Sequence, residues 1–197
     1  MSDSIEFFDR QFEDQIRQGQ NRLNRFELMT QAYLRGEVLD LGCGLGNLAI
    51  AAAEAGCRVL AVDAAPTAVA HLQRIAGERG LCLTAAQADL RRYRIEADYD
   101  AVVSIGLLMF FDRDTALAQL AQLKAHVRPG GIAAVNVLIE GTTFLDMFGT
   151  DDHYLFRRDE LTDAFKEWDI LVESFSDSDA PRSTLKRFVT VIARRPF

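Results

Sequence analysis

The sequence predicts an α/β fold in which a doubly wound, mostly parallel sheet of seven strands carries helices on both faces. From residue 37 onward, short apolar runs alternate with amphipathic stretches of about 10 to 15 residues, a pattern typical of βαβ units in a parallel sheet. The length of 197 residues, 49% of them apolar, suits a single domain with a full hydrophobic core. The fold is therefore expected to need neither disulfides nor a metal.

Each element can be justified in turn. Apolar side chains recur at roughly helical spacing between residues 5 and 34, which predicts one or two helices ahead of the sheet. Phe8 and Phe12 belong to this stretch and form either its packing stripe or a lid over the site. Pro66 stands in a first helical turn, where proline is favoured, and the Arg-Pro-Gly-Gly turn at 128–131 is expected to end a helix. Predicted strands are 37–41, 57–63, 81–89, 99–106 and 132–140, and predicted helices between them are 47–56, 66–80 and 113–127.

The last third of the chain has a different pattern. A loop at 141–156 leads to a predicted helix at 158–167 and to strands at 168–177 and 185–195, which a polar stretch separates. Strands joined in this way indicate an antiparallel edge added to the parallel sheet. We expect one domain over 1–197, made of a helical cap (1–35), a cofactor-binding core (36–140) and a substrate-side loop with the antiparallel edge (141–197).

Charge and cysteine usage limit the partners. The net charge of −7 makes nucleic acid a poor default partner, because phosphate backbones attract lysine and arginine. Cys43, Cys57 and Cys82 form no metal-binding or disulfide pattern, which indicates free thiols in a reducing compartment. The start of the sequence has no apolar signal core, and no apolar run is long enough to cross a membrane. We expect a cytoplasmic protein that acts on a small molecule, without nucleic-acid or membrane partners, and its oligomeric state is left open.

The most informative segment is the glycine-rich loop after the first predicted strand. Asp40 and Leu41 end that strand, and Gly42, Gly44 and Gly46 follow at alternate positions. Glycines permit left-handed backbone and let a ligand approach the main chain closely. The dinucleotide fingerprint GxGxxG is not matched, because the third glycine comes one residue early. Asp40 would repel a pyrophosphate, whereas it would suit the cationic group of an amino-acid ligand.

Two further acids favour a nucleoside with an amino-acid tail. Asp63 ends the second strand, where its carboxylate would accept hydrogen bonds from both hydroxyls of a ribose. Asp89 follows the third strand, within reach of an adenine amino group. Simpler interpretations stay open: the glycines make only a tight turn, Asp63 caps the next helix, and Asp89 is a solvated turn residue. Cys43 is favoured as a small buried residue over a reactive thiol.

These features together resemble the class I S-adenosylmethionine-dependent methyltransferases, which share the VLDLGCGLG loop, the acid ending the second strand and the Arg-Pro-Gly-Gly turn. The resemblance covers residues 37–140 and implies the strand order 3-2-1-4-5-7-6 with the last strand antiparallel. It also implies S-adenosyl-L-methionine as cofactor, S-adenosyl-L-homocysteine as product and no metal. The cofactor site implied by the resemblance consists of Asp40, Leu41, Gly42, Cys43, Gly44, Asp63, Ala64, Asp89, Leu90, Ser104 and Ile105.

A narrower resemblance is to the tellurite-resistance (TehB-type) methyltransferases. It rests on the Leu-Leu-Met-Phe-Phe turn at 107–111 and on a basic residue directly before a phenylalanine in the last strand. By this resemblance Arg187 would attract an oxyanion or a polarised thiol. Arg182 and His153 join it as candidate catalytic residues, although the loop that carries Arg182 lacks the histidine of the family's pattern. An ordinary pair of strand-end charges is the alternative for the two arginines.

The expected reaction needs little catalytic machinery. Methyl transfer from a sulfonium leaves the donor uncharged, so alignment and exclusion of water matter more than a covalent nucleophile. An oxygen acceptor would need a general base, for which His153, Tyr154, Asp151 and Asp152 are candidates. A soft acceptor such as tellurite, selenite or a thiol would not. We predict a SAM-dependent methyltransferase for a small acceptor, with an NAD-dependent oxidoreductase and a non-catalytic SAM-binding module as alternatives.

Overall fold

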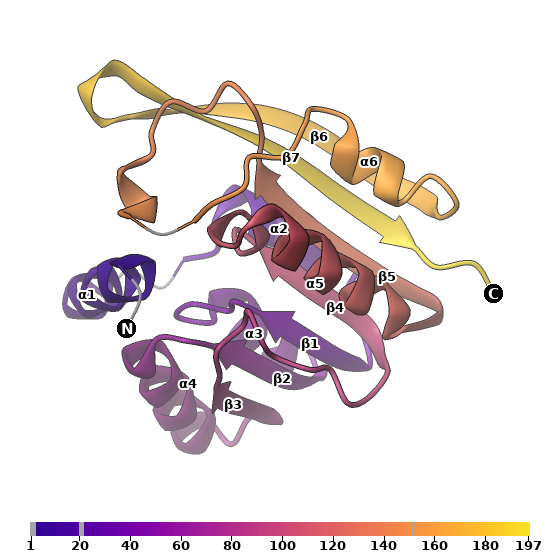
Figure 1. The fold of residues 1–197 in the computed structure, drawn as a ribbon. Coiled ribbons are helices and arrows are strands. Elements are labelled where there is room, and N and C mark those ends of the chain that lie inside the picture. Colours follow the sequence, from indigo (N-terminus) through magenta and orange to yellow (C-terminus); the bar gives the residue numbers. More distant parts are fainter. Residues whose placement is uncertain (1–2, 20–21, 151) are drawn as a thin grey trace.

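The protein is described by a computed structural model that covers residues 3–19, 22–150 and 152–197. Its core is one seven-stranded sheet in the order β3-β2-β1-β4-β5-β7-β6 (Figure 1). Strands β1 to β5 run parallel to one another, and β7 lies antiparallel between β5 and β6, so the predicted fold is confirmed. The strands are β1 (Glu37–Leu41), β2 (Arg58–Asp63), β3 (Leu83–Gln87), β4 (Tyr99–Ile105), β5 (Val127–Leu138), β6 (Asp169–Ala180) and β7 (Thr184–Arg194).

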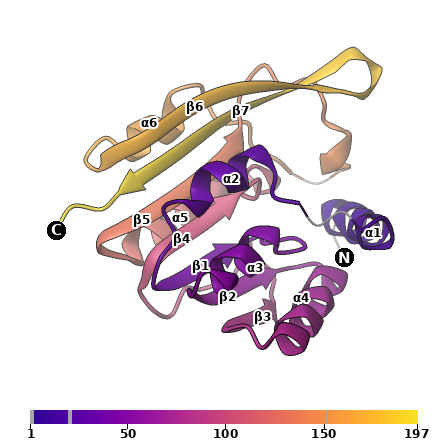
Figure 2. The same ribbon diagram turned by 180° about the vertical axis from the view of Figure 1, so that it is seen from behind.

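Helices cover both faces of this sheet. Helices α2, α3 and α4 lie on one face and α5 and α6 on the other, as the two opposite views show (Figures 1 and 2). Helix α1 lies apart from both layers, beyond the carboxyl ends of the parallel strands. The α-helices are α1 (Asp3–Arg17), α2 (Arg25–Gln31), α3 (Asn47–Glu54), α4 (Pro66–Arg79), α5 (Arg113–Ala125) and α6 (Glu160–Ala164), and the short 3₁₀ helices are η1 (Leu108–Phe110), η2 (Asp146–Phe148) and η3 (Pro181–Ser183).

Strand periodicity explains the two halves of the core. Successive side chains of a strand point to opposite faces, so Val102 of β4 packs under α5 while its neighbour Val103 packs under α3 and α4. Because both faces are covered, the central strands are mostly apolar, with Leu39 and Val62 fully buried. This arrangement leaves only the strand ends free to build a site.

The C-terminal half differs from the predicted boundaries in two places. Strand β5 begins at Val127 rather than after the Arg-Pro-Gly-Gly turn. The turn lies within the strand because the pairing with β4 shifts register there, and because the Gly130 N–H donates to the Arg195 carbonyl. The polar stretch expected to separate the last two strands is mostly strand, and the three residues of η3 join them. The resulting hairpin extends beyond the rest of the sheet (Figure 1). Within the described residues no helix has the length and apolar character needed to cross a membrane.

Candidate active site

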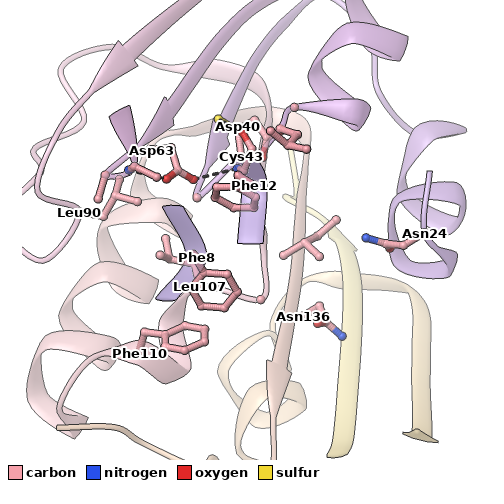
Figure 3. A pocket seen from close by; sticks show the side chains of 18 of the residues that line it. Phe8, Phe12, Asn24, Asp40, Cys43, Asp63, Leu90, Leu107, Phe110 and Asn136 are labelled. Atoms are coloured by element: carbon pink, nitrogen blue, oxygen red, sulfur yellow. Dashed lines mark hydrogen bonds between the residues drawn. The ribbon is translucent and has the colours of Figure 1, made fainter. Parts of the chain in front are cut away.

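A cavity of about 710 Å³ lies at the carboxyl ends of β1, β2 and β4, beneath α1 and α2 (Figure 3). It has two chemically distinct ends. The glycine-loop end is lined by Glu27, Asp40, Gly42, Cys43, Gly44, Gly46, Asp63, Ala64, Asp89 and Leu90. The aromatic end is lined by Phe8, Phe26, Met109, Phe110, Asn136, Leu138, Met147, Lys186 and Phe188.

The glycine loop requires glycine for two separate reasons. Gly42, Gly44 and Gly46 have φ values of 73°, 53° and 68°, in the left-handed region that other residues rarely adopt. A Cβ on Gly46 would lie 2.3 Å from a methyl carbon of the buried Leu72, so a side chain has no room where α3 begins. The Gly42 N–H donates to the Val62 carbonyl at 2.8 Å, which fixes the loop against β2.

Asp63 fixes the same loop through its side chain. One carboxylate oxygen accepts the Gly44 N–H at 2.8 Å and the other accepts the Ala65 N–H at 2.9 Å, the first of which is drawn in Figure 3. Burial raises the pKa of Asp63, whereas these backbone hydrogen bonds lower it. Each carboxylate oxygen can accept a second hydrogen bond, so Asp63 keeps capacity for the hydroxyls of a ligand. The first turn of α4 is instead capped from α1, since the Thr67 N–H donates to Asp9 at 3.0 Å.

Asp40 lies deeper and makes this end strongly acidic. Burial, followed by repulsion from Glu27 and Asp63, raises its pKa to about 8. Glu27, which the sequence interpretation did not single out, comes from the first turn of α2, where it completes a capping box with Asn24. A buried acid that cannot ionise freely is stabilised in its charged form by a nearby cation. This cluster therefore suits a ligand with an ammonium group.

The remaining predicted residues of the cofactor site divide into two groups. Ala64, Leu90 and Ile105 line the cavity with the glycine loop. Leu41 and Ser104 do not, because the pleat turns both side chains into the core, where they are almost fully buried.

Asp89 and Cys43 have contrasting environments at this end. Partial burial raises the pKa of Asp89, but its hydrogen bonds to the backbone and side chain of Arg91 outweigh that effect, so the pKa is lowered. Both of those bonds measure 3.1 Å. Asp89 is thus a charged, fixed carboxylate at the edge of the cavity. Cys43 is buried and its thiol pKa is raised by burial and by the nearby acids Asp40 and Asp63, which fits a small packing residue rather than a nucleophile.

The aromatic end is assembled from distant parts of the chain. Phe8 of α1 meets Phe110 edge to face, with ring centres 5.1 Å apart, and Phe26 of α2 lies 4.9 Å from Phe188 of β7. Phe12 also lines the cavity, beside Gly44. The helical cap therefore contributes directly to the cavity, and the sequence interpretation, which left its role open, named Phe8 and Phe12 but missed Phe26 and Phe188.

The three candidate catalytic residues lie outside the lining of this cavity, and their catalytic role stays a prediction. Arg182 pairs with Asp146, and Arg187 pairs with Asp177 at 3.3 Å. His153 stacks on the ring of Phe148 with centres 4.3 Å apart. Side-chain alternation on β7 turns Lys186 and Phe188 toward the cavity and Arg187 away from it. Arg182 lies in η3, and His153 lies in the loop after η2.

The candidate bases for an oxygen acceptor also lie elsewhere. Tyr154 donates to Glu160 at 2.6 Å, outside the cavity lining, and Asp152 is exposed. Asp151 lies outside the described residues. In the described part of the chain no group of three or more histidine, cysteine or acidic side chains is placed to hold a metal ion. The chemistry of the cavity thus depends on its acids, its backbone N–H groups and its aromatic wall.

Comparison with known proteins connects this geometry to a family. Residues 38–131, which hold the glycine loop, Asp63 and Asp89, match the family described as a methyltransferase domain. These residues make up the part of the chain that resembles a methyltransferase domain. Among curated relatives, the probable S-adenosyl-L-methionine-dependent methyltransferase TehB of Haemophilus influenzae is 26% identical over 172 residues, covering 81% of this chain and 57% of the relative. Hemagglutinin 1 of Eikenella corrodens is 30% identical over 167 residues, covering 81% and 55%.

Solved structures extend the comparison to the fold. TehB from Haemophilus influenzae superposes with a TM-score of 0.76 at 21% identity, covering 88% of this chain and 62% of that chain. A structure described as the conversion of a disulfide bond into a thioacetal group during echinomycin biosynthesis matches with a TM-score of 0.63 at 26% identity, covering 87% and 82%. This methyltransferase domain spans little more than half the length of the curated relatives named above. The predicted resemblance to TehB-type methyltransferases is confirmed.

The methyltransferase domain fits the cofactor of its family, S-adenosylmethionine. The glycine loop leaves no room for a Cβ at Gly46, Asp63 keeps free acceptor capacity, and the acids around Asp40 match an ammonium group. Asp89 lines the same end of the cavity, and its contact with adenine stays a prediction. The prediction of this cofactor is confirmed at the level of the family.

Proposed function

We propose that this protein transfers a methyl group from S-adenosylmethionine to a small, soft nucleophile, namely an oxyanion of selenium or tellurium or a thiol. The observation that carries the proposal is the composition of the aromatic end. Its described lining contains aromatic, methionine and leucine side chains together with Asn136 and Lys186, but neither a histidine nor a carboxylate. An acceptor that must lose a proton to react would need such a base. A selenium, tellurium or thiolate nucleophile has an available electron pair without one.

The two ends of the cavity would have different roles, with the glycine-loop end binding the cofactor and the aromatic end enclosing the reacting atoms. When bound, the cofactor supplies a methyl carbon on a positively charged sulfur. Asp40 and Glu27 would hold its ammonium group, Asp63 its ribose hydroxyls and Asp89 its adenine, while Phe8 and Phe110 would exclude water from the reacting atoms. The acceptor would supply the electron pair for the new bond to carbon, and the cofactor's sulfur would leave with the pair of the broken carbon–sulfur bond as a neutral thioether. Exclusion of water favours this step because charge is dispersed in the transition state.

The comparisons add support for a soft acceptor. TehB-type proteins are among the relatives, and the echinomycin structure is described in terms of sulfur chemistry. These descriptions apply to those proteins. For this chain they guide the choice of acceptors to test.

Single-turnover transfer of a labelled methyl group tests the proposal. The purified protein, in excess over labelled S-adenosylmethionine, is mixed with selenite, tellurite or a small thiol, and with a matched alcohol as control. We expect label in the selenium, tellurium or thiol product and none in the alcohol. Saturable binding of S-adenosylhomocysteine without transfer to any acceptor would instead support a non-catalytic binding module. Protection from thermal unfolding by NAD(H), and not by S-adenosylhomocysteine, would support the oxidoreductase alternative.

A further inference from the structure

Lys186 occupies an unusual position at the aromatic end of the cavity. It lies on β7 two residues before Phe188, and strand alternation places both side chains on the cavity side. Its ammonium nitrogen lies 4.7 Å from the centre of the Phe144 ring. Among the described ion pairs none includes Lys186, so within that part of the chain its charge meets an aromatic face and no carboxylate.

The other cations near the cavity are differently placed. Arg91 is paired with Asp89 at the glycine-loop end, and Arg187 is paired with Asp177 on the opposite face of β7. Arg22 also lines the cavity, but its backbone carbonyl accepts from Asn47 at the start of α3, beside the glycine loop. Among the described residues that define the aromatic end, Lys186 is the one with a cationic side chain.

Partial burial makes the charged form of Lys186 less stable unless an anion binds beside it. The side chain is half-buried, and desolvation lowers the pKa of Lys186. A cation that has lost water without gaining a carboxylate is stabilised by any anion that reaches it, through a charge-assisted hydrogen bond. The cation–π contact with Phe144 replaces part of the lost hydration and holds the side chain in place.

We propose that Lys186 makes the aromatic end specific for a methyl acceptor that carries a negative charge. This inference rests on the proposed function and adds to it the substrate class and the residue that selects it. It also replaces the role that the sequence gave to Arg187 and Arg182, whose charges are already neutralised by Asp177 and Asp146. The aromatic rings would contact the soft nucleophilic atom while the ammonium contacts the anionic group.

A pair of matched thiols tests the proposal. 3-Mercaptopropionate carries a carboxylate, and 3-mercaptopropionamide has nearly the same shape without charge. In Lys186→Met an apolar stem is retained, while the charge and its cation–π contact with Phe144 are removed. We expect KM for 3-mercaptopropionate to rise roughly tenfold, the range of one charge-assisted hydrogen bond, and KM for the amide to stay within about twofold. Lys186→Arg, which keeps the charge, should restore most of the preference.

Two comparison variants and one binding measurement separate the outcomes. Lys166→Met makes the same change at an exposed lysine and should leave both KM values unaltered. Equal effects of Lys186→Met on the two thiols, or loss of the anion preference in Arg187→Gln but not in Lys186→Met, would overturn the proposal. If neither these thiols nor selenite or tellurite is methylated, the proposed function fails. Calorimetry of 3-mercaptopropionate binding to the S-adenosylhomocysteine complex then still decides the role of Lys186. Weaker binding in Lys186→Met than in Lys166→Met supports it, and equal binding refutes it.

Discussion

The two ends of the cavity are built in opposite ways. The glycine-loop end is formed mainly from residues 40–90, where the ends of three neighbouring parallel strands deliver backbone N–H groups and carboxylates. The aromatic end combines residues from α1, α2, η1, β5 and β7, so its members range from Phe8 to Phe188. The first end depends on local conformation and charge, and the second on long-range packing. Substitutions at the first should therefore alter ionisation and cofactor affinity, and those at the second should alter the acceptor.

The largest expected effect is on stability, and it follows from replacing the buried Asp40 carboxyl group at the glycine-loop end. The pKa of Asp40 is raised from an ordinary 3.8 to about 8, so between these values the folded protein keeps a proton that the unfolded chain has released. Stability must then fall as the pH rises from about 4 to about 8. At about 1.4 kcal/mol per pKa unit, this shift corresponds to about 6 kcal/mol. Asp40→Asn removes this cost and should be more stable than the wild type by about that amount at pH 8.

Urea unfolding at pH 5 and pH 8 measures this difference. At pH 5 the free energy of unfolding of Asp40→Asn should exceed that of the wild type by much less, because keeping Asp40 protonated destabilises the folded wild type less at that pH. Asp114→Asn is the matched control, since the Asp114 side chain is 95% exposed and should leave the pH dependence unchanged. A wild type and an Asp40→Asn variant with parallel pH profiles would show that Asp40 ionises normally.

The second effect concerns cofactor affinity. Asp63→Ala removes one hydrogen bond to the glycine loop and one to Ala65 before α4, as well as the acceptor for the ribose. We therefore expect affinity for S-adenosylhomocysteine to fall about 100-fold, or about 2.7 kcal/mol. Isothermal titration calorimetry measures the loss. Asp63→Asn retains the shape and should lose less. Asp177→Ala, which removes an acid outside the cavity, should bind as the wild type does, and a similar loss there would contradict the assignment.

The smallest effect is expected at the aromatic end. Phe188→Leu shortens the wall that Phe26 and Phe188 form together, which costs on the order of 1 kcal/mol of aromatic contact. We expect KM for the acceptor to rise about fivefold, with affinity for S-adenosylhomocysteine changed by less than about twofold. Phe175→Leu, on β6 and outside this cavity, is the control. If Phe188→Leu weakened the cofactor more than the acceptor, the two ends would not be functionally separate.

The same contrast explains what the sequence could predict. The fold and the acids Asp40, Asp63 and Asp89 follow from strand ends and a contiguous glycine loop, whose conformation is set within a few residues. Glu27 was missed because a capping box is a local feature of α2, and nothing in that segment reveals that it faces Asp40 across the cavity. The link between Asp9 and Thr67 joins residues 58 positions apart and has no local signal.

The last strand shows a second kind of limit. Lys186 and Arg187 are adjacent basic residues, and the family resemblance favoured Arg187. Which of them faces the cavity depends on the register of β7, where Phe188 pairs with Leu138 of β5. A shift of one residue would exchange their faces, and the strand pattern alone does not fix that register against a distant partner. The structure places Lys186 with Phe188 at the cavity.

The double hydrogen bond of Asp63 has a consequence for how the protein binds. This carboxylate joins the glycine loop to the segment before α4 without any ligand, so the loop loses its conformational freedom during folding rather than during binding. Its backbone amides should show equally high order parameters in the free and the bound protein. Rearrangement on binding would then be concentrated in the helical cap, where one bond from Thr67 to Asp9 ties α1 to α4. The glycine loop should therefore stay rigid throughout binding, and motion of the helical cap should set the rates at which the ligand binds and leaves.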